Sequence, residues 1–160
     1  MAMAQPLTEP VALGPADAGE LLTLQRAAYV TEARLHDDVG LPPLRQTLEE
    51  LLAELEDPAC QAWGVRESGR LVAGVRVHRV DAGTAEVGRL VVAPDRQGNG
   101  LGTALLSWAE DHVPSTVTTV RLFTGERSTA NLRLYHRLGY RETGRVPAGD
   151  YALVYLAKRR

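Results

Sequence analysis

The sequence predicts an α/β protein of the α+β type, built around one sheet, and three observations carry that prediction. Two amphipathic helical patterns precede most of the strands, over residues 17–35 and 44–55. A stretch of period-two alternation follows over residues 61–92 and is typical of an antiparallel meander. A glycine-rich turn then opens a third helix, after which strands and one short helix complete the chain.

The first elements follow from apolar spacing and from proline. Leu7–Leu13 is predicted as a short strand, and a helix starting at Pro15 or Asp17 is expected to continue toward Leu35. Pro42-Pro43 forces a turn before a second helix, which Pro58 ends. The leucines expected on one stripe of that second helix are Leu44, Leu48, Leu51, Leu52 and Leu55.

The remaining elements are bounded by turn residues. Three strands lie between Gln61 and Val92, with turns at residues 68–69 and 81–83, and the last of them covers residues 85–92. The helix after the glycine turn ends at Pro114, and residues 117–123 form a buried strand. Ser128 is expected to cap a short helix that Gly139 closes, and residues 140–146 and 150–156 form two closing strands.

Length and composition predict one domain over residues 1–160, with residues 1–6 as a flexible tail. The chain is 44% hydrophobic and 24% charged with a formal net charge of −2, so no nucleic-acid partner is expected. No apolar stretch approaches the length of a membrane span. Cys60 is the only cysteine and no signal peptide is recognised, which favours a cytoplasmic location. The histidines are scattered without metal-ligand spacing, and no metal site is expected.

The glycine-rich turn spans residues 96–103, Arg-Gln-Gly-Asn-Gly-Leu-Gly-Thr. A strand that feeds a helix through such a turn leaves several backbone N–H groups unpaired at the positive end of the helix dipole. This is the arrangement that binds phosphate groups. The alternative is a β-to-α turn without a ligand, but three glycines in five residues carry an entropic cost that a ligand site would explain.

Two other phosphate-binding motifs fit the turn poorly. A Walker-type loop requires Gly-Lys-Ser/Thr, and this turn contains no lysine. The dinucleotide fingerprint G-x-G-x-x-G would place its third glycine at position 103, which is Thr103, and the preceding meander is not a βαβ unit. A nucleotide-binding protein of another fold stays open as an alternative on these grounds.

A second motif, Asn131-x-x-x-Tyr135-x-x-x-Gly139-Tyr140, follows in the short helix. Asn131 and Tyr135 are four residues apart and share one helix face. Together with Val92-x-Pro94 and the turn at residues 97–102, this motif resembles the GNAT family, the GCN5-related N-acetyltransferases. The order of elements resembles the family from about residue 7 to residue 156. The resemblance implies a twisted, mostly antiparallel mixed sheet of about six to seven strands, flanked by about four helices and splayed between its fourth and fifth strands.

The resemblance also implies a co-substrate, acetyl-CoA, and residues that hold it. Its pyrophosphate would be bound by the backbone amides of the turn. The backbone of three strand residues would pair with the pantetheine arm, and Asn131 would contact the same arm. The expected cofactor-binding residues are Leu90, Val91, Val92, Gln97, Gly98, Asn99, Gly100, Gly102, Thr103, Asn131 and Tyr135.

Transfer of an acetyl group to an amine requires a base, an oxyanion donor and an acid. Tyr135, whose unperturbed pKa would be about 10, is expected to protonate the departing CoA thiolate. Glu86 alternates with Gly88, Leu90 and Val92, so it is placed on their sheet face and is a candidate general base. The alternative for Glu86 is a solvated strand-end glutamate, and Glu126 and Glu32 are reserve candidates.

The acceptor is less well specified by the sequence. The resemblance implies an amine of a small molecule, protein or peptide, and acidic residues in a loop around residues 29–37 are candidates to bind a cationic amine. N- or O-transfer, acyl-chain preference and oligomeric state stay open, and a homodimer would be compatible with the fold. A CoA-binding sensor or interaction module with little turnover is the alternative function.

Overall fold

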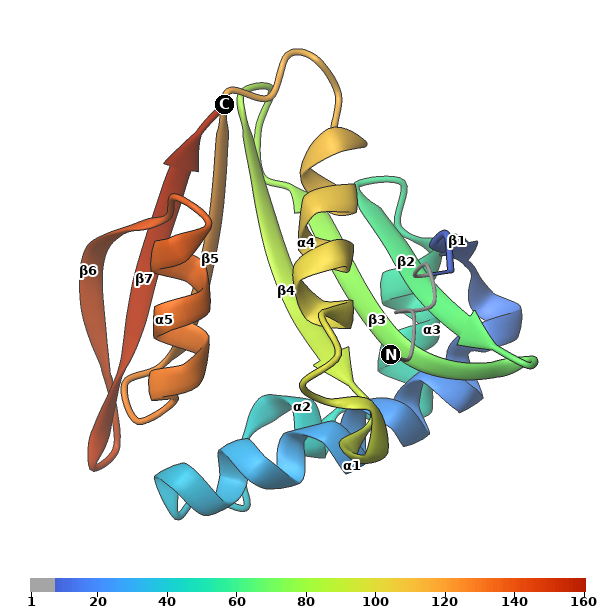
Figure 1. Ribbon diagram of the computed structural model, residues 1–160, viewed down its shortest axis with the longest axis horizontal. Helices are drawn as coiled ribbons and strands as arrows, with labels where there is room; N and C mark the ends of the chain where they lie inside the picture. Colours follow the sequence, from blue (N-terminus) through green and yellow to red (C-terminus); the bar gives the residue numbers. More distant parts are fainter. Residues whose placement is uncertain (1–7) are drawn as a thin grey trace, which may run out of the picture.

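The computed structural model describes residues 8–160 and contains a seven-stranded mixed sheet with helices on both faces (Figure 1). The strand order is β1-β2-β3-β4-β5-β7-β6. Every neighbouring pair is antiparallel except β4 and β5, which run parallel. The predicted architecture is therefore confirmed. The tail expected at residues 1–6 lies outside the described residues.

The first half of the sheet is the predicted meander with one short edge strand. Its strands are β1 (Val11–Leu13), β2 (Cys60–Glu67), β3 (Arg70–Arg79) and β4 (Thr84–Val92). The turn between β2 and β3 has positive φ at both central residues, Ser68 and Gly69, which matches the twist of a hairpin. β1 begins at Val11, so the strand is shorter than the Leu7–Leu13 segment predicted; Leu7 itself lies outside the described residues.

The first helix follows the predicted range of residues 17–35 closely, as its apolar pattern indicated. α1 (Ala18–His36) continues without a break through the segment expected to be a loop around residues 29–37, and it ends only at Asp37, which has φ 48°. The loop prediction was wrong because the polar residues there occupy the exposed side of a helix. Ala33 and His36 are buried on its other side.

The second predicted helix is two helices, α2 (Pro42–Arg45) and α3 (Leu48–Glu56). The chain becomes extended at Gln46, and Thr47 then begins α3 with a capping box in which Thr47 and Glu50 exchange side-chain-to-backbone hydrogen bonds. The leucine stripe therefore belongs to two helices. The break buries the Gln46 side chain, whose Oε1 accepts from Gln25 at 3.0 Å.

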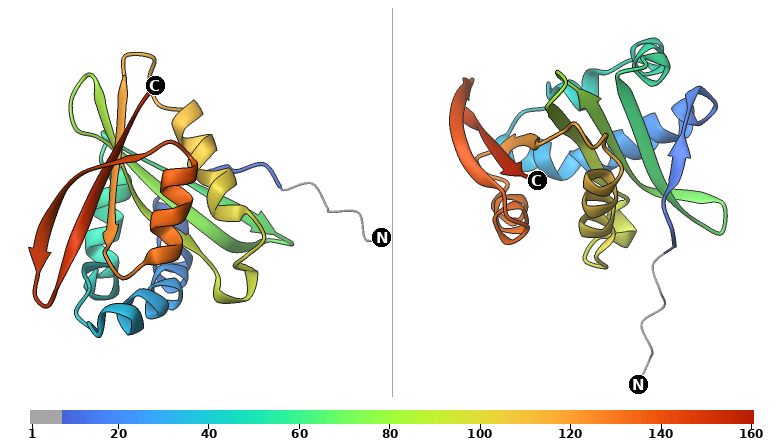
Figure 2. Two further views of the ribbon diagram at one scale, coloured as in Figure 1. Left: turned by 60° about the vertical axis from the view of Figure 1, so that its left-hand side comes forward. Right: turned by 90° about the horizontal axis from the view of Figure 1, so that it is seen from above.

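Helices cover both faces of the first half-sheet (Figures 1 and 2). A Cβ at Gly74 of β3 would lie 3.0 Å from the Leu21 side chain of α1, which places α1 on that face. α4 (Leu101–Asp111) lies on the opposite face, since a Cβ at Gly102 would lie 3.8 Å from the Val92 side chain. The side chains between these layers form one apolar core that includes Leu51, Val75 and Leu105.

The second half of the sheet comprises β5 (Thr119–Gly125), β7 (Tyr151–Arg159) and β6 (Arg141–Ala148), with α5 (Thr129–Arg137) packed beside them. α5 ends as expected at Gly139, which has φ 98°. Ser128 precedes α5 as predicted, but its side chain does not cap the helix. It bonds instead to Glu32 of α1.

The two halves meet at a short parallel junction. β4 and β5 pair only over Thr84–Glu86 and Thr119–Arg121, although β4 has 9 residues and β5 has 7. Beyond that point the strands diverge, which Figure 1 shows as the gap between β4 and β5. The predicted splay between the fourth and fifth strands is therefore confirmed.

β4 contains a bulge just where the strands diverge. The register with β3 passes from Arg76↔Gly88 to Gly74↔Val91, so two β4 residues, Arg89 and Leu90, stand opposite one residue of β3. Arg89 has φ 50°, an unusual backbone for a non-glycine residue.

The bulge reverses the alternation of side chains along β4. Glu86 and Gly88 pair with His78 and Arg76 and face α1, and Val91 pairs with Gly74 on the same face. Val92 consequently faces α4. The expectation that Glu86, Leu90 and Val92 share one face was wrong, because a single extra residue shifts the period of two.

Within residues 8–160, no helix has the length and hydropathy that a membrane crossing requires.

Candidate active site

The glycine turn connects β4 to α4 at the open end of the splay. Gly98 and Gly100 have φ of 80° and 81°, and a Cβ at either position would meet no atom within 4 Å. The Asn99 side chain closes the turn by donating to the carbonyls of Arg96 and Gln97 at 3.0 and 3.1 Å. The turn is thus ordered by its own side chains, and it leaves its backbone open to a ligand.

The backbone N–H groups of this turn have no acceptor. Among the described residues, no carbonyl or side-chain oxygen accepts from the N–H groups of residues 97–103, and the first bond of α4 runs from Ala104 to Gly100 at 3.0 Å. These N–H groups lie at the positive end of the α4 dipole. The arrangement supports binding of a phosphate or pyrophosphate group.

Two bidentate ion pairs fix the entry to the turn. Arg96 donates to both carboxylate oxygens of Glu67 at 2.7 and 2.8 Å, and Arg70 donates to both of Asp95 at 2.7 Å each. The hydrogen bonds from Arg70 lower the pKa of Asp95 to about 2. Because these pairs tie the turn to the β2–β3 hairpin, they position the N–H groups. Sequence reasoning missed them, since their spacing along the chain carries no signal.

Leu90, Val91 and Val92 lie along the diverging part of β4. Val91 and Val92 pair with Gly74 and Ala73 of β3, and their other edge faces the splay and not β5. The backbone on that edge is available to a ligand lying as an added strand.

Tyr135 of α5 is 7% exposed. Burial raises the pKa of its hydroxyl above the usual range, and Tyr29 and Glu32 raise it further. The phenol is therefore protonated at neutral pH. Its ring contacts Tyr140 edge-on, with centroids 6.1 Å apart.

Glu32 of α1 joins the predicted residues of α5. One carboxylate oxygen accepts a short hydrogen bond from Ser128, and the other accepts from the Asn131 amide at 3.4 Å. The same amide reaches the Thr124 hydroxyl of β5 at 3.5 Å. Asn131 and Tyr135 thus share a face as expected, and Glu32, only a reserve candidate in the sequence, lies beside both.

Glu86 lies at the closed end of the splay, where β4 and β5 still pair. Its carboxylate accepts from Arg121 Nε at 2.8 Å across that pairing. The pair is partly exposed, with side-chain exposures of 29% for Glu86 and 43% for Arg121. The base role of Glu86 stays a prediction. Its carboxylate is already paired with Arg121, which would compete with an acceptor ammonium for it. The other reserve candidate, Glu126, accepts from the Ala152 N–H at 2.9 Å and pairs with Arg145.

Arg89 of the site went unnoticed in the sequence, and Tyr29 was considered only as part of the segment around residues 29–37. Tyr29 lies among Arg89, Arg76 and Glu32, and its pKa is raised by burial, with Arg89 and Arg76 opposing the rise. Arg89 is the bulge residue of β4. A glycine followed by an arginine within an apolar strand is the signal that would have indicated a bulge at this position.

Within the described part of the chain, no group of three or more His, Cys, Asp and Glu side chains is arranged to hold a metal ion.

These features define a class of protein: a split mixed sheet, an open helix N-terminus beside the split, and a buried tyrosine on the helix after the split. Residues 23–140 match the Acetyltransferase (GNAT) family. The chain therefore belongs to the GNAT family, whose members use acetyl-CoA as acyl donor, and the resemblance noted in its motifs is confirmed.

Two curated relatives come from Bacillus subtilis (strain 168). The chain is 30% identical over 137 residues to the UPF0157 protein YqkA, a match that covers 86% of this chain and 38% of that protein. It is 26% identical over 153 residues to S-(2-succino)cysteine N-acetyltransferase, covering 89% of this chain and 90% of the relative. The chain thus spans well under half of the first relative and most of the second.

Among solved structures, the fold is similar to that of the PaiA N-acetyltransferase from Thermoplasma acidophilum, determined in complex with coenzyme A. The TM-score is 0.76 at 18% identity, covering 95% of this chain and 98% of that one.

Proposed function

We propose that this protein is an acetyl-CoA-dependent N-acetyltransferase that transfers the acetyl group directly to an amine of a small molecule, protein or peptide. The observation that carries the proposal is the run of unpaired N–H groups over residues 97–103 at the open end of the splayed sheet. Acetyl-CoA supplies an activated acetyl thioester and a pyrophosphate that such a run can bind.

The cofactor-binding residues are proposed in two groups. Gln97, Gly98, Asn99, Gly100, Gly102 and Thr103 hold the pyrophosphate through the backbone. Leu90, Val91 and Val92 offer a free strand edge to the pantetheine arm, and Asn131 contacts the same arm from α5. The open space at Gly98 and Gly100 fits this assignment, because a ligand can approach a backbone that carries no side chain.

Tyr135 is proposed as the proton donor to the departing thiolate. Burial and the neighbouring Glu32 keep the phenol protonated, so it enters the reaction as an acid and not as a base. The remaining step for the protein is then removal of a proton from the acceptor ammonium. A backbone N–H near Leu90 to Val92 is the proposed donor to the oxyanion.

Two carboxylates compete for the base role. Glu86 was the first choice from the sequence, but it is paired with Arg121 at the closed end of the junction. Glu32 is next to Tyr135 and Asn131, and it is the reserve candidate that the geometry favours. The pH profile of kcat/KM in the variants Glu86→Gln and Glu32→Gln distinguishes the two carboxylates. The fall in kcat/KM at acidic pH should disappear in the variant that lacks the base and should persist in the other variant.

The cofactor assignment is tested with a pair of matched glycines. Gly100→Ala and Gly69→Ala both place a methyl group on a backbone with φ near 80° and with no atom within 4 Å. Both should therefore cost similar stability, but only Gly100→Ala should weaken acetyl-CoA binding, by about tenfold or more. Isothermal titration measures the affinity. Equal affinities for acetyl-CoA in the two variants would remove the turn from the site.

The acid role is tested by Tyr135→Phe, with Tyr155→Phe on β7 as control. Loss of a positioned acid should lower kcat by about 10²-fold while the affinity for acetyl-CoA stays nearly unchanged. Release of free CoA thiol over a panel of amines measures turnover. An unchanged rate would reject Tyr135 as the acid. Tight acetyl-CoA binding with no release over a broad panel would indicate a CoA-binding module instead of an enzyme.

A further inference from the structure

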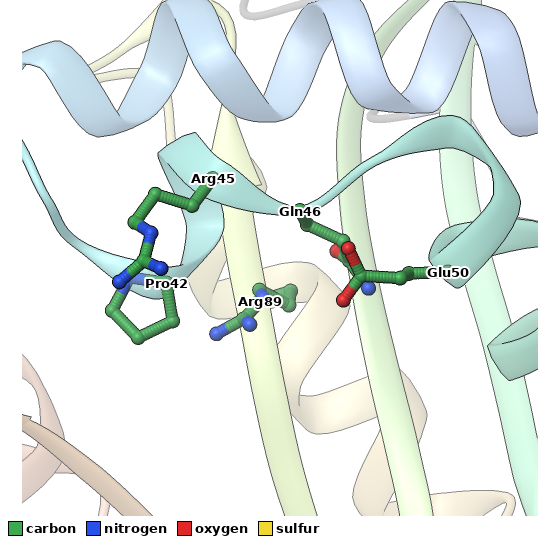
Figure 3. A pocket seen from close by; sticks show the side chains of 5 residues that line it. All are labelled: Pro42, Arg45, Gln46, Glu50 and Arg89. Atoms are coloured by element: carbon green, nitrogen blue, oxygen red, sulfur yellow. The ribbon is translucent and has the colours of Figure 1, made fainter.

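A pocket of about 250 Å³ lies on the α1 face of the sheet, between α2, the start of α3 and the β4 bulge (Figure 3). The residues that line it are Pro42, Arg45, Gln46, Glu50 and Arg89. Figure 3 shows the guanidinium groups of Arg45 and Arg89 on one side of this space and the Glu50 carboxylate on the other. The pocket is therefore polar, and it is large enough for the side chain or carboxylate end of a small ligand.

Arg89 is held in this pocket by an unusual backbone. The bulge and the φ of 50° turn its side chain toward α1 and α2, where a regular strand would have placed a different residue. Its Nε is buried and has no hydrogen-bond partner among the described residues. A buried donor without an acceptor in a strained segment is a common feature of ligand sites.

The charge in the pocket is positive and unbalanced. Among residues 8–160, neither Arg45 nor Arg89 forms an ion pair, whereas the neighbouring Arg76 is paired with Glu54. Glu50 is the only acidic residue in the lining, and its Oε1 accepts from the Thr47 N–H in the capping box.

Gln46 adds a donor to the two arginines. Its Oε1 accepts from Gln25 at 3.0 Å and from Arg76 at 3.2 Å, so the oxygen is fully used by the protein. The amide NH₂ group is the part left for a ligand. Two guanidinium groups and an amide donor together match the acceptor oxygens of a carboxylate.

The pocket is connected to the reacting centre through α1. Arg89 directly precedes Leu90, the first of the strand residues proposed to hold the pantetheine arm. Tyr29 and Glu32 lie three residues apart on one face of α1; burial raises the pKa of Tyr29, and Arg89 is among the charges that oppose this rise. A ligand that starts at the arginines can therefore reach a cationic end to Glu32, beside the tyrosine proposed as acid. The two ends of the site have opposite charge.

We propose that the acceptor is an amine that also carries a carboxylate, with Arg45 and Arg89 binding the carboxylate and Glu32 receiving the ammonium. This inference rests on the proposed acetyl transfer for the identity of the reaction, but the anion site stands on the pocket itself. A purely cationic polyamine would be a poor acceptor, because its far end would meet two unpaired arginines.

The first experiment compares free-CoA release from α-amino acids and from the matching α-amino amides. The wild type should prefer the acids by about tenfold or more in kcat/KM, since the amides keep the amine and lose only the carboxylate charge. Arg89→Gln should reduce this preference to near unity. Arg79→Gln, which removes the same charge from the exposed end of β3, should retain it. Equal rates for acids and amides in the wild type, or an undiminished preference in Arg89→Gln, would overturn the proposal.

The second experiment does not depend on turnover. Succinate should raise the melting temperature of the wild type and of Arg79→Gln relative to sodium chloride at equal ionic strength. It should have no such effect on the Arg45→Gln/Arg89→Gln variant. Absence of stabilisation by succinate, or stabilisation by putrescine in its place, would reject an anion site.

The two proposals fail in different ways. If no acceptor releases CoA, or acetyl-CoA does not bind, the transferase function is rejected, while the succinate measurement still decides the pocket. If CoA is released with putrescine as readily as with amino acids, transfer stands and the carboxylate-bearing acceptor is rejected.

Discussion

The two halves of the sheet differ in how completely their strands are buried. The strands before the splay, β1–β4, lie between α1 and α3 on one face and α4 on the other, and their core is apolar. Among the strands after it, β5 and β7 contribute buried side chains such as Val120 and Val154 to the same core, whereas β6 is exposed at every residue except Ala148. Stability should therefore be concentrated in the first half, where apolar area is removed from water on both faces.

The contacts that join the halves across the open end of the splay are mostly polar and come from the end of α1. Glu32 accepts from Ser128 and Asn131, and His36 Nε2 accepts from the Arg127 N–H at 3.1 Å. These polar contacts between the end of α1 and the second half of the sheet form the joint between the halves. They can be altered without creating a cavity in the apolar core. We expect the first half to carry most of the stability and the joint to determine the geometry of the site.

The largest effect on the free energy of unfolding is expected in the apolar core between the first half of the sheet and α4. Leu105→Ala removes a fully buried side chain of α4 and should lower the free energy of unfolding by about 2–5 kcal/mol. Val146→Ala on β6, where the side chain is 48% exposed, should change it by less than about 0.5 kcal/mol. Urea unfolding followed by circular dichroism gives both values. Similar losses in the two variants would contradict the contrast between the halves.

An intermediate effect is expected at the joint. A Cβ at Gly125 of β5 would overlap the His36 ring, so Gly125→Ala should displace α1 from Arg127 and cost about 1–3 kcal/mol. Gly144→Ala on β6 is the matched control, because no atom lies within 4 Å of the added methyl group. The melting temperatures should separate the two. If they were equal, the joint at His36 would have no energetic role.

The smallest effect is a pH dependence at the outer end of the joint. Tyr151 donates to the Asp38 carboxylate at 2.7 Å, which lowers the pKa of Asp38, while burial first and then this bond raise the pKa of Tyr151 to about 12. A lowered carboxyl pKa adds stability above its unfolded value of 3.8, and this is lost as the pH falls through the folded pKa. A raised phenol pKa adds stability below its unfolded value of 10.0, and this is lost as the pH rises through about 12.

The difference in melting temperature between the wild type and Tyr151→Phe should consequently be constant from neutral pH to mild acid. It should shrink once the pH falls below the ordinary pKa of aspartate, 3.8. Thermal scans from pH 3 to pH 8 measure it, in steps of about one unit. A difference that grew toward acid would assign the stabilisation to another pair.

The sequence predicted the fold through features that act locally. The period of two over β2–β4, the turn at Ser68-Gly69 and the glycine at position 139 each determine the structure within a few residues of themselves. The glycine turn likewise indicated its own ligand chemistry. The order of these elements was sufficient to predict the sheet and its splay.

The features that the sequence did not predict depend on one-residue irregularities and on contacts between residues that are distant in sequence. The bulge at Arg89 reversed the faces of β4, and the break at Gln46 divided one helix into two. Both deviations bring polar side chains to Arg76 or to the neighbouring pocket. No local pattern records the position of Glu32 beside Ser128 and Asn131, since these residues meet only when the halves come together.

Lys158 is the only lysine of the sequence, and the surroundings of its amine have a practical consequence for any assay of this chain. Its ammonium donates to Glu110 at 2.9 Å and lies over the Tyr140 ring, whose hydroxyl bonds the same carboxylate at 2.7 Å. A nitrogen that donates to a carboxylate has no lone pair to offer as a nucleophile. The protein therefore presents almost no side-chain amine that could consume the acyl donor, and self-acetylation should add little background to measurements of CoA release.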